Sequence, residues 1–459
     1  MSAPTRLECF KAYDIRGRVP SQLSEELAMK IGQAYAAVVG AKRVVIGHDI
    51  RRSSQAMVAA LVDGLTSSGV DVALIGLCGT EEVYFATAHL QASGGIMVTA
   101  SHNPADYNGM KLVREGSRPI SGDTGLKEIE AAVLAGVTPP AGARGKTEEV
   151  SVREAYVKHL LTYVDRAALK PLTIVANAGN GCAGPTLDAI APHLPFSFVR
   201  LYHDPDGSFP NGVPNPLLVE NRTATREAVL AAHANFGVAW DGDFDRCFLF
   251  DEQGNFIEGY YIVGLLAQQL LARSPGGKVI HDPRLTWNTL DLVKAAGGTP
   301  VLCKSGHAFI KERMRAEDAI YGGEMSAHHY FRDFSYCDSG MIPWLLVAQA
   351  VSQLGPLSAL VENRMARFPA SGEINRRIPD GKQAIAAIRA RYEPAAKNVD
   401  QTDGISLEYD RWRFNLRISN TEPLIRLNVE ARGDETLMRE KTEEILSLLA
   451  ELGATEESH

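Results

Sequence analysis

The sequence predicts an α/β protein made of three successive α/β units and a smaller C-terminal α+β domain. Two observations carry this prediction. Short β-branched runs alternate with helical patterns along most of the chain, whereas strands are grouped together near its C-terminal end. The length of 459 residues is also well past the size at which a single hydrophobic core stops growing, so we expect several domains.

The predicted strands of the first three units form groups of three, and each strand ends in a polar or glycine-rich loop. A helical pattern such as SSQAMVAALVDGLTSSG (53–69) follows the first strand of each group. This alternation predicts helices packed on a mostly parallel sheet. The nine runs are RVVIGHD (43–49), DVALIGL (71–77), GIMVTASHNP (95–104), LTIVANAGNG (172–181), FSFVRLYHD (196–204), GVAWDGDFDR (237–246), KVIHDPR (278–284), TPVLCKSGH (299–307) and AIYGGEMSAHH (319–329).

The last strand of each group ends in the loop with the most distinctive chemistry: a serine, then three aspartates, then Glu-Met-Ser. Ligands of open α/β sheets bind at the carboxyl ends of the strands. We therefore expect the three loops to face one cleft and to build a composite site. The alternative is that these are ordinary polar loops at strand ends.

The C-terminal part has a different pattern. A strand (372–378) and a helix (382–392) precede three further strands, and a charged amphipathic helix (435–452) follows them. Strands grouped in this way indicate a separate α+β domain. The predicted domains are 1–145 with the serine loop, 146–252 with the aspartate loop, 253–366 with the Glu-Met-Ser loop, and 367–459.

Composition excludes several functional classes. Lys and Arg number 47 against 55 Asp and Glu, a net charge of −8 without a basic block, so nucleic acid and anionic membranes are poor partners. A small anionic substrate stays open, because local clusters of Arg and Lys can bind it. The six cysteines form no C-x-x-C pair, and no apolar segment is long enough to span a membrane. We expect a cytoplasmic protein.

The segment TASHNPADYNGMK (99–111) places Ser101 at the end of an apparent strand, before a polar loop with His102, Asn103 and a Gly-rich turn. The spacing is not the G-x-S-x-G of an esterase, and no acid or base follows in the arrangement of a catalytic triad. The groups that act with Ser101 must therefore come from elsewhere in the chain.

The segment DGDFDR (241–246) places three carboxylates, Asp241, Asp243 and Asp245, at alternate positions after an apolar run. Clustered carboxylates stay ionised only beside a cation, and oxygen ligands favour Mg²⁺ over zinc. An EF-hand does not fit, because Arg246 replaces the glycine at the sixth position and CFLF continues as a strand. The other alternative is a solvated acidic turn. Arg246 offers a fork of donors to a phosphate.

Two further segments carry chemistry. In GGEMSAHHYF (322–331), Glu324 and Ser326 form a pair suited to sugar hydroxyls, and His328 or His329 could transfer protons. RISNTEPLIR (417–426) indicates a cradle for a phosphate dianion, although its centre also fits a β-turn. The cradle residues are Arg417, Ser419, Asn420, Thr421 and Arg426.

Five segments, taken in order, resemble the α-D-phosphohexomutase family, and within it the bacterial phosphomannomutase/phosphoglucomutase type. The segments are KAYDIRG (11–17), TASHNPADYNGMK (99–111), DGDFDR (241–246), GEMSAHH (323–329) and RISNTEP (417–423). The resemblance covers essentially the whole chain. It implies four domains, three of them related mixed α/β units, around a central cleft.

The resemblance also implies roles for residues. Ser101 is phosphorylated and holds Mg²⁺ through a phosphoserine oxygen, together with Asp241, Asp243 and Asp245. Glu324 and Ser326 hold sugar hydroxyls, and the loop at 417–421 binds the phosphate that does not react. Other residues implied in catalysis or substrate binding are Tyr13, Arg16, His102, Lys111, Arg246, Arg284, Lys304, Gly306, His307 and His328. Arg284 stands where relatives often have lysine, and Ala-His-His stands where many have Gly-His.

The implied reaction converts hexose 6-phosphate and hexose 1-phosphate into each other. It passes through phosphoserine and a hexose 1,6-bisphosphate, which is intermediate and activator, with Mg²⁺ as cofactor. Mannose and glucose differ only at C2, whereas Glu324 and Ser326 are expected to hold O3 and O4, so we expect both sugars to react. The implied setting is a monomer or weak homodimer that acts on small-molecule hexose phosphates and supplies nucleotide-sugar and surface polysaccharide synthesis.

Three alternatives stay open at this stage. A metal-dependent phosphatase would use the same serine and Mg²⁺ but transfer the phosphoryl group to water. A non-catalytic sensor would bind sugar phosphates without turnover. A phosphoglucosamine mutase would share the reaction and differ in the substituent at C2.

Overall fold

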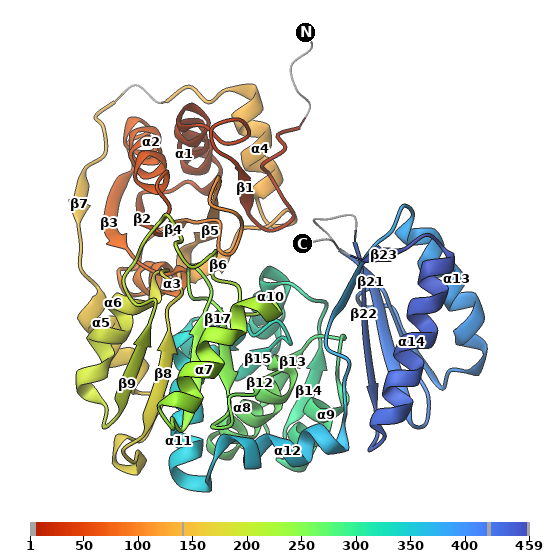
Figure 1. The fold of residues 1–459 in the computed structure, drawn as a ribbon. Coiled ribbons are helices and arrows are strands. Elements are labelled where there is room, and N and C mark those ends of the chain that lie inside the picture. Colours follow the sequence, from red (N-terminus) through yellow and green to blue (C-terminus); the bar gives the residue numbers. More distant parts are fainter. Residues whose placement is uncertain (1–5, 140–141, 420–423, 457–459) are drawn as a thin grey trace. The chain divides into compact units, whose positions relative to one another are not determined.

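The computed structural model describes residues 6–139, 142–419 and 424–456. The chain divides into two compact units, each made of two segments. The first unit is Met1–Phe256 with His328–Leu357, and the second is Ile257–Ala327 with Ser358–His459. Figure 1 shows helices and strands alternating along most of the chain. The predicted α/β organisation is therefore confirmed.

The first unit begins with a mixed sheet in the order β1-β5-β4-β2-β3-β7, with β6 paired to β5. Strands β4, β2, β3 and β7 are parallel, and β1 and β5 run antiparallel to their neighbours. Its elements are β1 (Ile15–Arg18), α1 (Glu25–Val39), β2 (Arg43–His48), α2 (Ser54–Ser67), β3 (Asp71–Leu77), α3 (Thr80–His89), β4 (Gly94–Val98), β5 (Tyr107–Arg114), β6 (Arg118–Pro119), α4 (Leu126–Ala135) and β7 (Thr147–Glu149).

Alternation along the central strand β2 explains how helices cover both faces of this sheet. Val44 and Ile46 are buried in a core with side chains of α1, α2 and α4, whereas Val45 is buried in a second core with side chains of α3. Successive strand residues point to opposite faces, so an apolar run fits a sheet that is covered on both sides. Figure 1 shows α1 and α2 on one side and α3 on the other.

The second sheet has the order β12-β11-β10-β8-β9, in which β8, β9 and β10 are parallel and β11 is antiparallel. A β-hairpin, β16 with β17, and the buried helix α11 complete the first unit. These elements are α5 (Arg153–Leu161), β8 (Thr173–Asn177), α6 (Ala183–Ile190), β9 (Ser197–Leu201), α7 (Thr223–Ala231), β10 (Phe236–Trp240), β11 (Cys247–Phe250), β12 (Phe256–Ile257), β16 (His329–Phe331), β17 (Cys337–Asp338) and α11 (Met341–Leu354).

The second unit contains three parallel strands in the order β14-β13-β15 and an antiparallel sheet in the order β19-β20-β21-β22-β18-β23. Helices α13 and α14 pack on the antiparallel sheet, as predicted for an α+β domain. The elements are α8 (Gly259–Arg273), β13 (Lys278–His281), α9 (Trp287–Ala295), β14 (Thr299–Leu302), α10 (His307–Glu317), β15 (Tyr321–Gly323), α12 (Leu357–Arg367), β18 (Ile374–Arg377), α13 (Gly381–Tyr392), β19 (Asn398–Asp400), β20 (Ile405–Glu408), β21 (Trp412–Ile418), β22 (Leu424–Ala431), α14 (Glu435–Glu451) and β23 (Thr455–Glu456).

Short 3₁₀ helices connect several of these elements. They are η1 (Glu115–Ser117), η2 (Arg166–Ala168), η3 (Ala191–His193), η4 (Val219–Arg222), η5 (Arg332–Phe334) and η6 (Glu393–Ala395). Among the described residues, no single helix has the length and apolar character needed to cross a membrane. Helices α11 and α12 together are long and apolar enough, but the chain bends by 98° between them. Helix α11 is buried in the core of the first unit.

A buried carboxylate, Glu81 at the start of α3, connects three segments of the first unit. It accepts hydrogen bonds from the hydroxyls of Tyr156 and Ser339, and from the backbone N–H groups of Gly340 (2.5 Å) and Met341 (3.2 Å). The last two donors belong to the N-terminus of α11, where unpaired N–H groups favour an acceptor. Burial outweighs these bonds and raises the pKa of Glu81 to about 8.

The raised pKa makes the stability of the first unit depend on pH. The folded protein keeps the proton up to a pKa of about 8, whereas the unfolded chain releases it near 4.5. The stabilising contribution is therefore complete below pH 4.5 and is lost as the pH rises to about 8. We expect Glu81→Gln to lose less stability than wild type between these values.

Urea denaturation midpoints at pH 5 and pH 8 measure this difference. Glu81→Ala should lower the free energy of unfolding by at least about 2 kcal/mol at either pH, because buried donors lose their acceptor. Glu26→Gln, which changes an exposed carboxylate on α1, is the control. Equal pH dependence in Glu81→Gln and wild type would contradict the prediction.

Candidate active site

Ser101 lies just beyond β4, in a left-handed backbone conformation with a φ of 49°. The side chain is buried, with 3% of the residue surface exposed. Its Oγ lies 2.7 Å from Asp241 Oδ2 and 3.1 Å from His102 Nδ1. The hydroxyl that the sequence predicts as isolated therefore touches the aspartate loop, which lies 140 residues further along the chain.

The loop after Ser101 is held by Arg51, a residue that the sequence analysis does not identify. Its guanidinium donates to four backbone carbonyls, at Ser101 (3.0 Å), Asn103 (2.5 Å), Pro104 (2.6 Å) and Tyr107 (3.0 Å). Five donors in a rigid fork make arginine suited to such a cage. Arg51 follows β2 in the chain, so only the sheet order, which places β2 beside β4, could have indicated its role.

A turn follows the serine at residues 101–106, but the glycine of this segment, Gly109, lies in a strand and not in the predicted turn. Residues 107–114 form β5, which pairs with β4 so that Met97 lies opposite Lys111. The polar, glycine-containing start of this run conceals a strand whose other members are buried. This pairing brings Lys111 to the serine and explains how a residue ten positions further along enters the same site.

The aspartate loop follows β10 and approaches the serine loop closely. A Cβ on Gly242 would lie 2.6 Å from the carbonyl oxygen of Ser101, so a side chain at that position would separate the two loops. Asp241, Asp243 and Asp245 are all buried, and one carboxylate oxygen from each lies within 4.8 Å of the others. The prediction that the three side chains form a cluster agrees with this geometry.

Two cations balance part of this charge. Lys111 Nζ lies 2.7 Å from Asp243 Oδ2 and 2.5 Å from Asp245 Oδ2, and Arg246 Nη2 lies 2.8 Å from Asp241 Oδ2. Burial opposes ionisation of Lys111, but the two carboxylates raise the pKa of its ammonium group. Burial raises the pKa of Asp241 to about 6 despite Arg246, whereas Lys111 and His328 outweigh burial and hold the pKa of Asp245 well below its usual value.

The donor set fits a hard divalent cation. Asp243 Oδ1 is buried and, among the described residues, has no hydrogen-bond partner, and Asp245 Oδ1 is buried with His328 Nε2 3.6 Å away. Three carboxylates also carry one more charge than Lys111 and Arg246 neutralise. Oxygen ligands of this kind suit Mg²⁺. A second group, Asp245 with His328 and Asp338, shares Asp245 and also brings one possible ligand atom from each residue within 4.8 Å of the others.

The other predicted residues of the first unit surround this cluster. His102 Nδ1 accepts a hydrogen bond from Arg246 Nη2 (2.6 Å), and burial, followed by Arg246 and Arg16, lowers the pKa of His102 well below its usual value. Arg16 pairs with Asp14 (2.7 Å) and donates to Asn103 (2.7 Å). Tyr13 is half-buried in the loop before β1.

The structure distinguishes the two histidines of the Ala-His-His segment. His328 Nε2 lies 3.6 Å from Asp245 Oδ1, and its side chain is 20% exposed. His329 is fully buried on β16, and burial, together with His328, lowers its pKa to about 3. His329 is therefore a neutral core residue, and His328 is the one of the two that can exchange protons with a ligand.

In the second unit, Glu324 lies buried after β15 and accepts a hydrogen bond from the backbone N–H of Gly306 (2.9 Å). Arg284 Nη2 lies 3.4 Å from both Glu324 Oε1 and Ser326 Oγ. The predicted sugar-binding pair thus shares one guanidinium. His307 is half-buried at the start of α10, and Lys304 is exposed with its ammonium 3.4 Å from the ring centre of Phe309.

The predicted phosphate cradle is described in part. Arg417 lies on β21 and Arg426 on β22, directly opposite each other, and Ser419 follows β21 with its N–H bonded to the Leu424 carbonyl (2.8 Å). Asn420 and Thr421 lie outside the described residues. Sequence reasoning missed a carboxylate here, Glu373, which pairs with both arginines.

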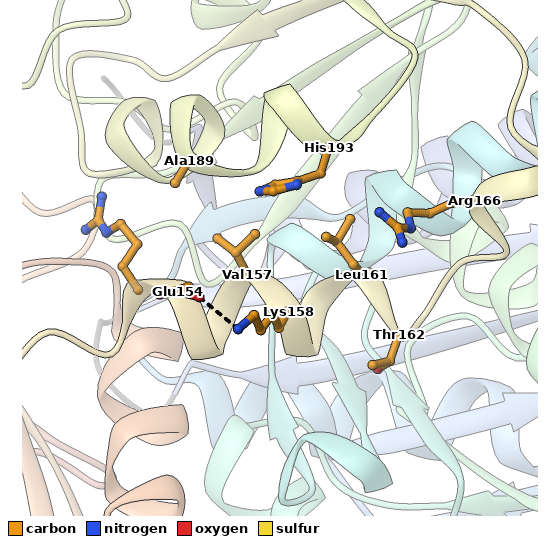
Figure 2. A pocket seen from close by; sticks show the side chains of 9 residues that line it. Glu154, Val157, Lys158, Leu161, Thr162, Arg166, Ala189 and His193 are labelled. Carbon is orange, nitrogen blue, oxygen red and sulfur yellow. Dashed lines mark ion pairs between the residues drawn. The ribbon is translucent and has the colours of Figure 1, made fainter.

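A pocket of about 640 Å³ lies away from all of these residues, between α5 and the segment of α6 and η3 (Figure 2). Figure 2 shows Val157 and Leu161 facing this space, with Lys158 paired to Glu154. It is lined by Arg153, Glu154, Val157, Lys158, Leu161, Thr162, Arg166, Ala189 and His193. No predicted site residue lines this pocket, so its shape does not indicate where the chemistry occurs.

The metal assignment makes a direct prediction. Replacing Asp243 by Asn removes one of three charged oxygen ligands, so we expect the Kd for Mn²⁺, used as a probe, to rise at least about 10-fold. Isothermal titration of each purified protein measures it. Asp123→Asn, at an exposed aspartate, is the matched control. An unchanged Kd in Asp243→Asn would rule out the cluster as the cation site.

Family models match the chain in four consecutive regions. They are described as domains I, II and III of phosphoglucomutase/phosphomannomutase, each α/β/α, and the C-terminal domain of the same family. The matched residues are 7–138, 154–254, 258–368 and 373–447. The fold class predicted from the sequence, three α/β domains and a C-terminal domain, is therefore confirmed.

Curated relatives and a solved structure are similar over nearly the full length. The phosphohexose mutases of Xanthomonas campestris are 62% identical over 96% of this chain and 99% of theirs. Phosphomannomutases of Salmonella typhimurium and Escherichia coli K12 are 60% and 58% identical over 97% of this chain, and over 99% and 100% of theirs. A phosphoglucomutase/phosphomannomutase family protein from Burkholderia thailandensis superposes with a TM-score of 0.88 at 31% identity, covering 97% of this chain and 98% of its own. The chain belongs to the phosphoglucomutase/phosphomannomutase family.

Proposed function

We propose that the protein is a phosphohexomutase of the phosphomannomutase/phosphoglucomutase type. It converts hexose 6-phosphate and hexose 1-phosphate into each other through a phosphorylated Ser101 and a hexose 1,6-bisphosphate. The observation that carries this proposal is the buried Ser101 hydroxyl, 2.7 Å from a cluster of three carboxylates that fits Mg²⁺. The names of the full-length relatives support the same reaction.

In the proposed mechanism, phosphoserine 101 transfers its phosphoryl group to a free hydroxyl of the hexose monophosphate, which then carries two phosphates. The bisphosphate reorients and returns its other phosphate to Ser101, leaving the isomeric monophosphate. When bound by Asp241, Asp243 and Asp245, Mg²⁺ supplies positive charge beside the transferring group. Catalysis of such transfers depends on positioning and electrostatics.

Residues of the chain contribute the remaining charge and proton transfer. Arg246 stabilises negative charge on the transferring phosphoryl group, and Arg51 fixes the loop from which Ser101 projects. Lys111 or a cleft histidine such as His328 would remove the proton of the attacking hydroxyl. His102, with a pKa well below its usual value, stays neutral and accepts from Arg246.

Substrate binding is assigned to residues of the second unit. Glu324 and Ser326 would hold the sugar hydroxyls O3 and O4, and Arg417, Ser419 and Arg426 would hold the phosphate that is not reacting. Asn420 and Thr421 are part of the same predicted loop. Further contacts are assigned to Tyr13, Arg16, Arg284, Lys304, Gly306 and His307. The proposed reaction requires both groups of residues to act on one substrate molecule.

The wider setting is part of the proposal. The net charge of −8 argues against nucleic acid and anionic membranes as partners. We propose a cytoplasmic monomer or weak homodimer that acts on small-molecule hexose phosphates. Its products would supply nucleotide-sugar and surface polysaccharide synthesis. We also propose domain boundaries after residues 145, 252 and 366.

Replacing Ser101 by Ala tests the phosphoryl carrier. We expect mutase activity to fall at least about 10⁴-fold, because alanine removes the hydroxyl that carries the phosphoryl group, and the neighbouring hydroxyls of Thr80 and Thr99 donate to Asp243 instead of Asp241. A coupled assay of hexose 1-phosphate turnover and intact-mass measurement of bound phosphate provide the readouts. Full activity without any phosphoserine would refute the mechanism. Release of free phosphate by wild type in excess of isomerisation would favour a phosphatase instead.

Substrate preference gives a second test. Since mannose and glucose share O3 and O4, we expect kcat/KM for mannose 1-phosphate and glucose 1-phosphate to agree within about 10-fold, the discrimination that small changes in substrate contacts give. Both assays contain the matching 1,6-bisphosphate as activator. N-Acetylglucosamine-type substrates, represented by glucosamine 1-phosphate, are the comparison. A higher kcat/KM for glucosamine 1-phosphate would identify a different mutase of the same class.

A further inference from the structure

The carboxylate of Glu373 lies among three arginines of the second unit. Glu373 Oε1 lies 2.9 Å from Arg426 Nη1, and Oε2 lies 3.0 Å from Arg417 Nη2 and 3.4 Å from Arg284 Nη1. The proposed function assigns these arginines to substrate binding. The carboxylate thus takes up donors that a phosphate would also use.

The strand register explains why an anion is needed at this position. Arg417 and Arg426 are cross-strand partners on β21 and β22, and like charges directly opposite each other destabilise an antiparallel pair. Glu373 immediately precedes β18, the strand on the other side of β22. Its Oε1 contacts the guanidinium of Arg426 and its Oε2 that of Arg417. The negative charge between the two arginines offsets their mutual repulsion.

Glu373 is also ionised throughout the working pH range. Burial would raise the pKa of its carboxyl group, but Arg417, Arg284 and Arg426 lower it to about 2. Arg284 has a second anionic partner, Asp282, at 2.7 Å. Arg417, whose ion pair is with Glu373, therefore depends on this carboxylate more than Arg284 does.

The arginines retain donors that Glu373 does not use. Arg417 Nε and Arg284 Nε are buried and, within the part of the chain that the structure describes, have no hydrogen-bond partner. Arg417 has 6% of its surface exposed and Arg284 has 3%. A carboxylate has two oxygens, whereas a phosphate monoester presents three and a second negative charge. The cluster is thus better matched to phosphate than to the carboxylate it holds.

We propose that Glu373 is an internal counter-ion that holds the arginine cluster while no phosphate is bound and competes with the phosphate of the substrate. The proposal rests on the proposed function, which assigns this cluster to the phosphate that is not reacting. In that reaction, the bisphosphate must release one phosphate from the cluster and present the other. A competing carboxylate keeps the affinity low enough for this exchange, and makes Glu373 a positioning residue.

The central test is the Kd for inorganic phosphate, measured by isothermal titration on wild type and Glu373→Gln. Removing a negative charge within about 3–4 Å of three guanidiniums should tighten phosphate binding at least about 5-fold. An unchanged or weaker affinity would overturn the proposal, because a residue that only supports the arginines would lose binding when changed.

Three control proteins locate the effect. In the double variant Glu373→Gln with Arg417→Gln, the gain in affinity should disappear. Glu435→Gln, which removes one exposed negative charge at the start of α14, should bind phosphate as wild type does. A gain in Glu435→Gln equal to that in Glu373→Gln would reduce the effect to net charge and overturn the proposal. If Glu373→Gln does not fold, Glu373→Asp should still bind phosphate no more weakly than wild type.

Stability and kinetics give readouts that a purely structural role would not reproduce. Without phosphate, the Tm of Glu373→Gln should lie below that of wild type. Saturating phosphate should raise the Tm of Glu373→Gln by more than it raises the Tm of wild type. For mannose 1-phosphate, both KM and kcat should fall, since tighter ground-state binding slows the exchange. A raised KM would overturn the proposal.

The two proposals fail separately. If wild type binds phosphate and Glu373→Gln binds it more tightly, but no hexose phosphate is isomerised, the proposed function fails and the counter-ion role stands. If wild type is an active mutase and Glu373→Gln gains no affinity, the counter-ion role fails and the function stands.

Discussion

A buried charge must be matched by an opposite charge. Within each of the two units, the positions of the charged side chains follow from this requirement. In the first unit, Asp241, Asp243 and Asp245 gather beside Ser101, and Lys111 and Arg246 form ion pairs with them. The three carboxylates carry one more charge than these two cations neutralise, which leaves an environment suited to one more positive ion. The site is therefore defined by carboxylates that lack enough positive charge beside them. The pocket in Figure 2 contains none of these residues.

In the second unit, arginines gather instead. Arg417 and Arg426 both pair with the carboxylate of Glu373, and Arg413 pairs with Glu430, which also accepts from backbone N–H groups at the start of α9. The same Arg413 donates to the carbonyls of Pro283 and Arg284. Ion pairs thus fix the backbone from which Arg284 projects. The proposed function assigns the metal to the carboxylates of the first unit and a phosphate to the arginines of the second.

Local patterns were sufficient to predict much of this protein. Asp241, Asp243 and Asp245 could be recognised because alternate carboxylates after an apolar strand have few other uses, and the alternation of strands and helices indicated the fold class. Arg51 and Glu373 could not, because each acts through residues that only the strand order brings near. The sequence predicts a Gly-rich turn within residues 99–111, whereas Gly109 belongs to β5 because residues 107–114 pair with β4.

The division of the first unit into two segments affects how the chain can fold during synthesis. Glu81 accepts from Ser339, Gly340 and Met341, and Trp344 of the following helix packs against Phe198. About 260 residues separate Glu81 from these partners. On the ribosome, the core of the first unit would therefore stay incomplete while all of Ile257–Ala327 is made. The first unit can therefore complete its core only after the first segment of the second unit has been synthesised.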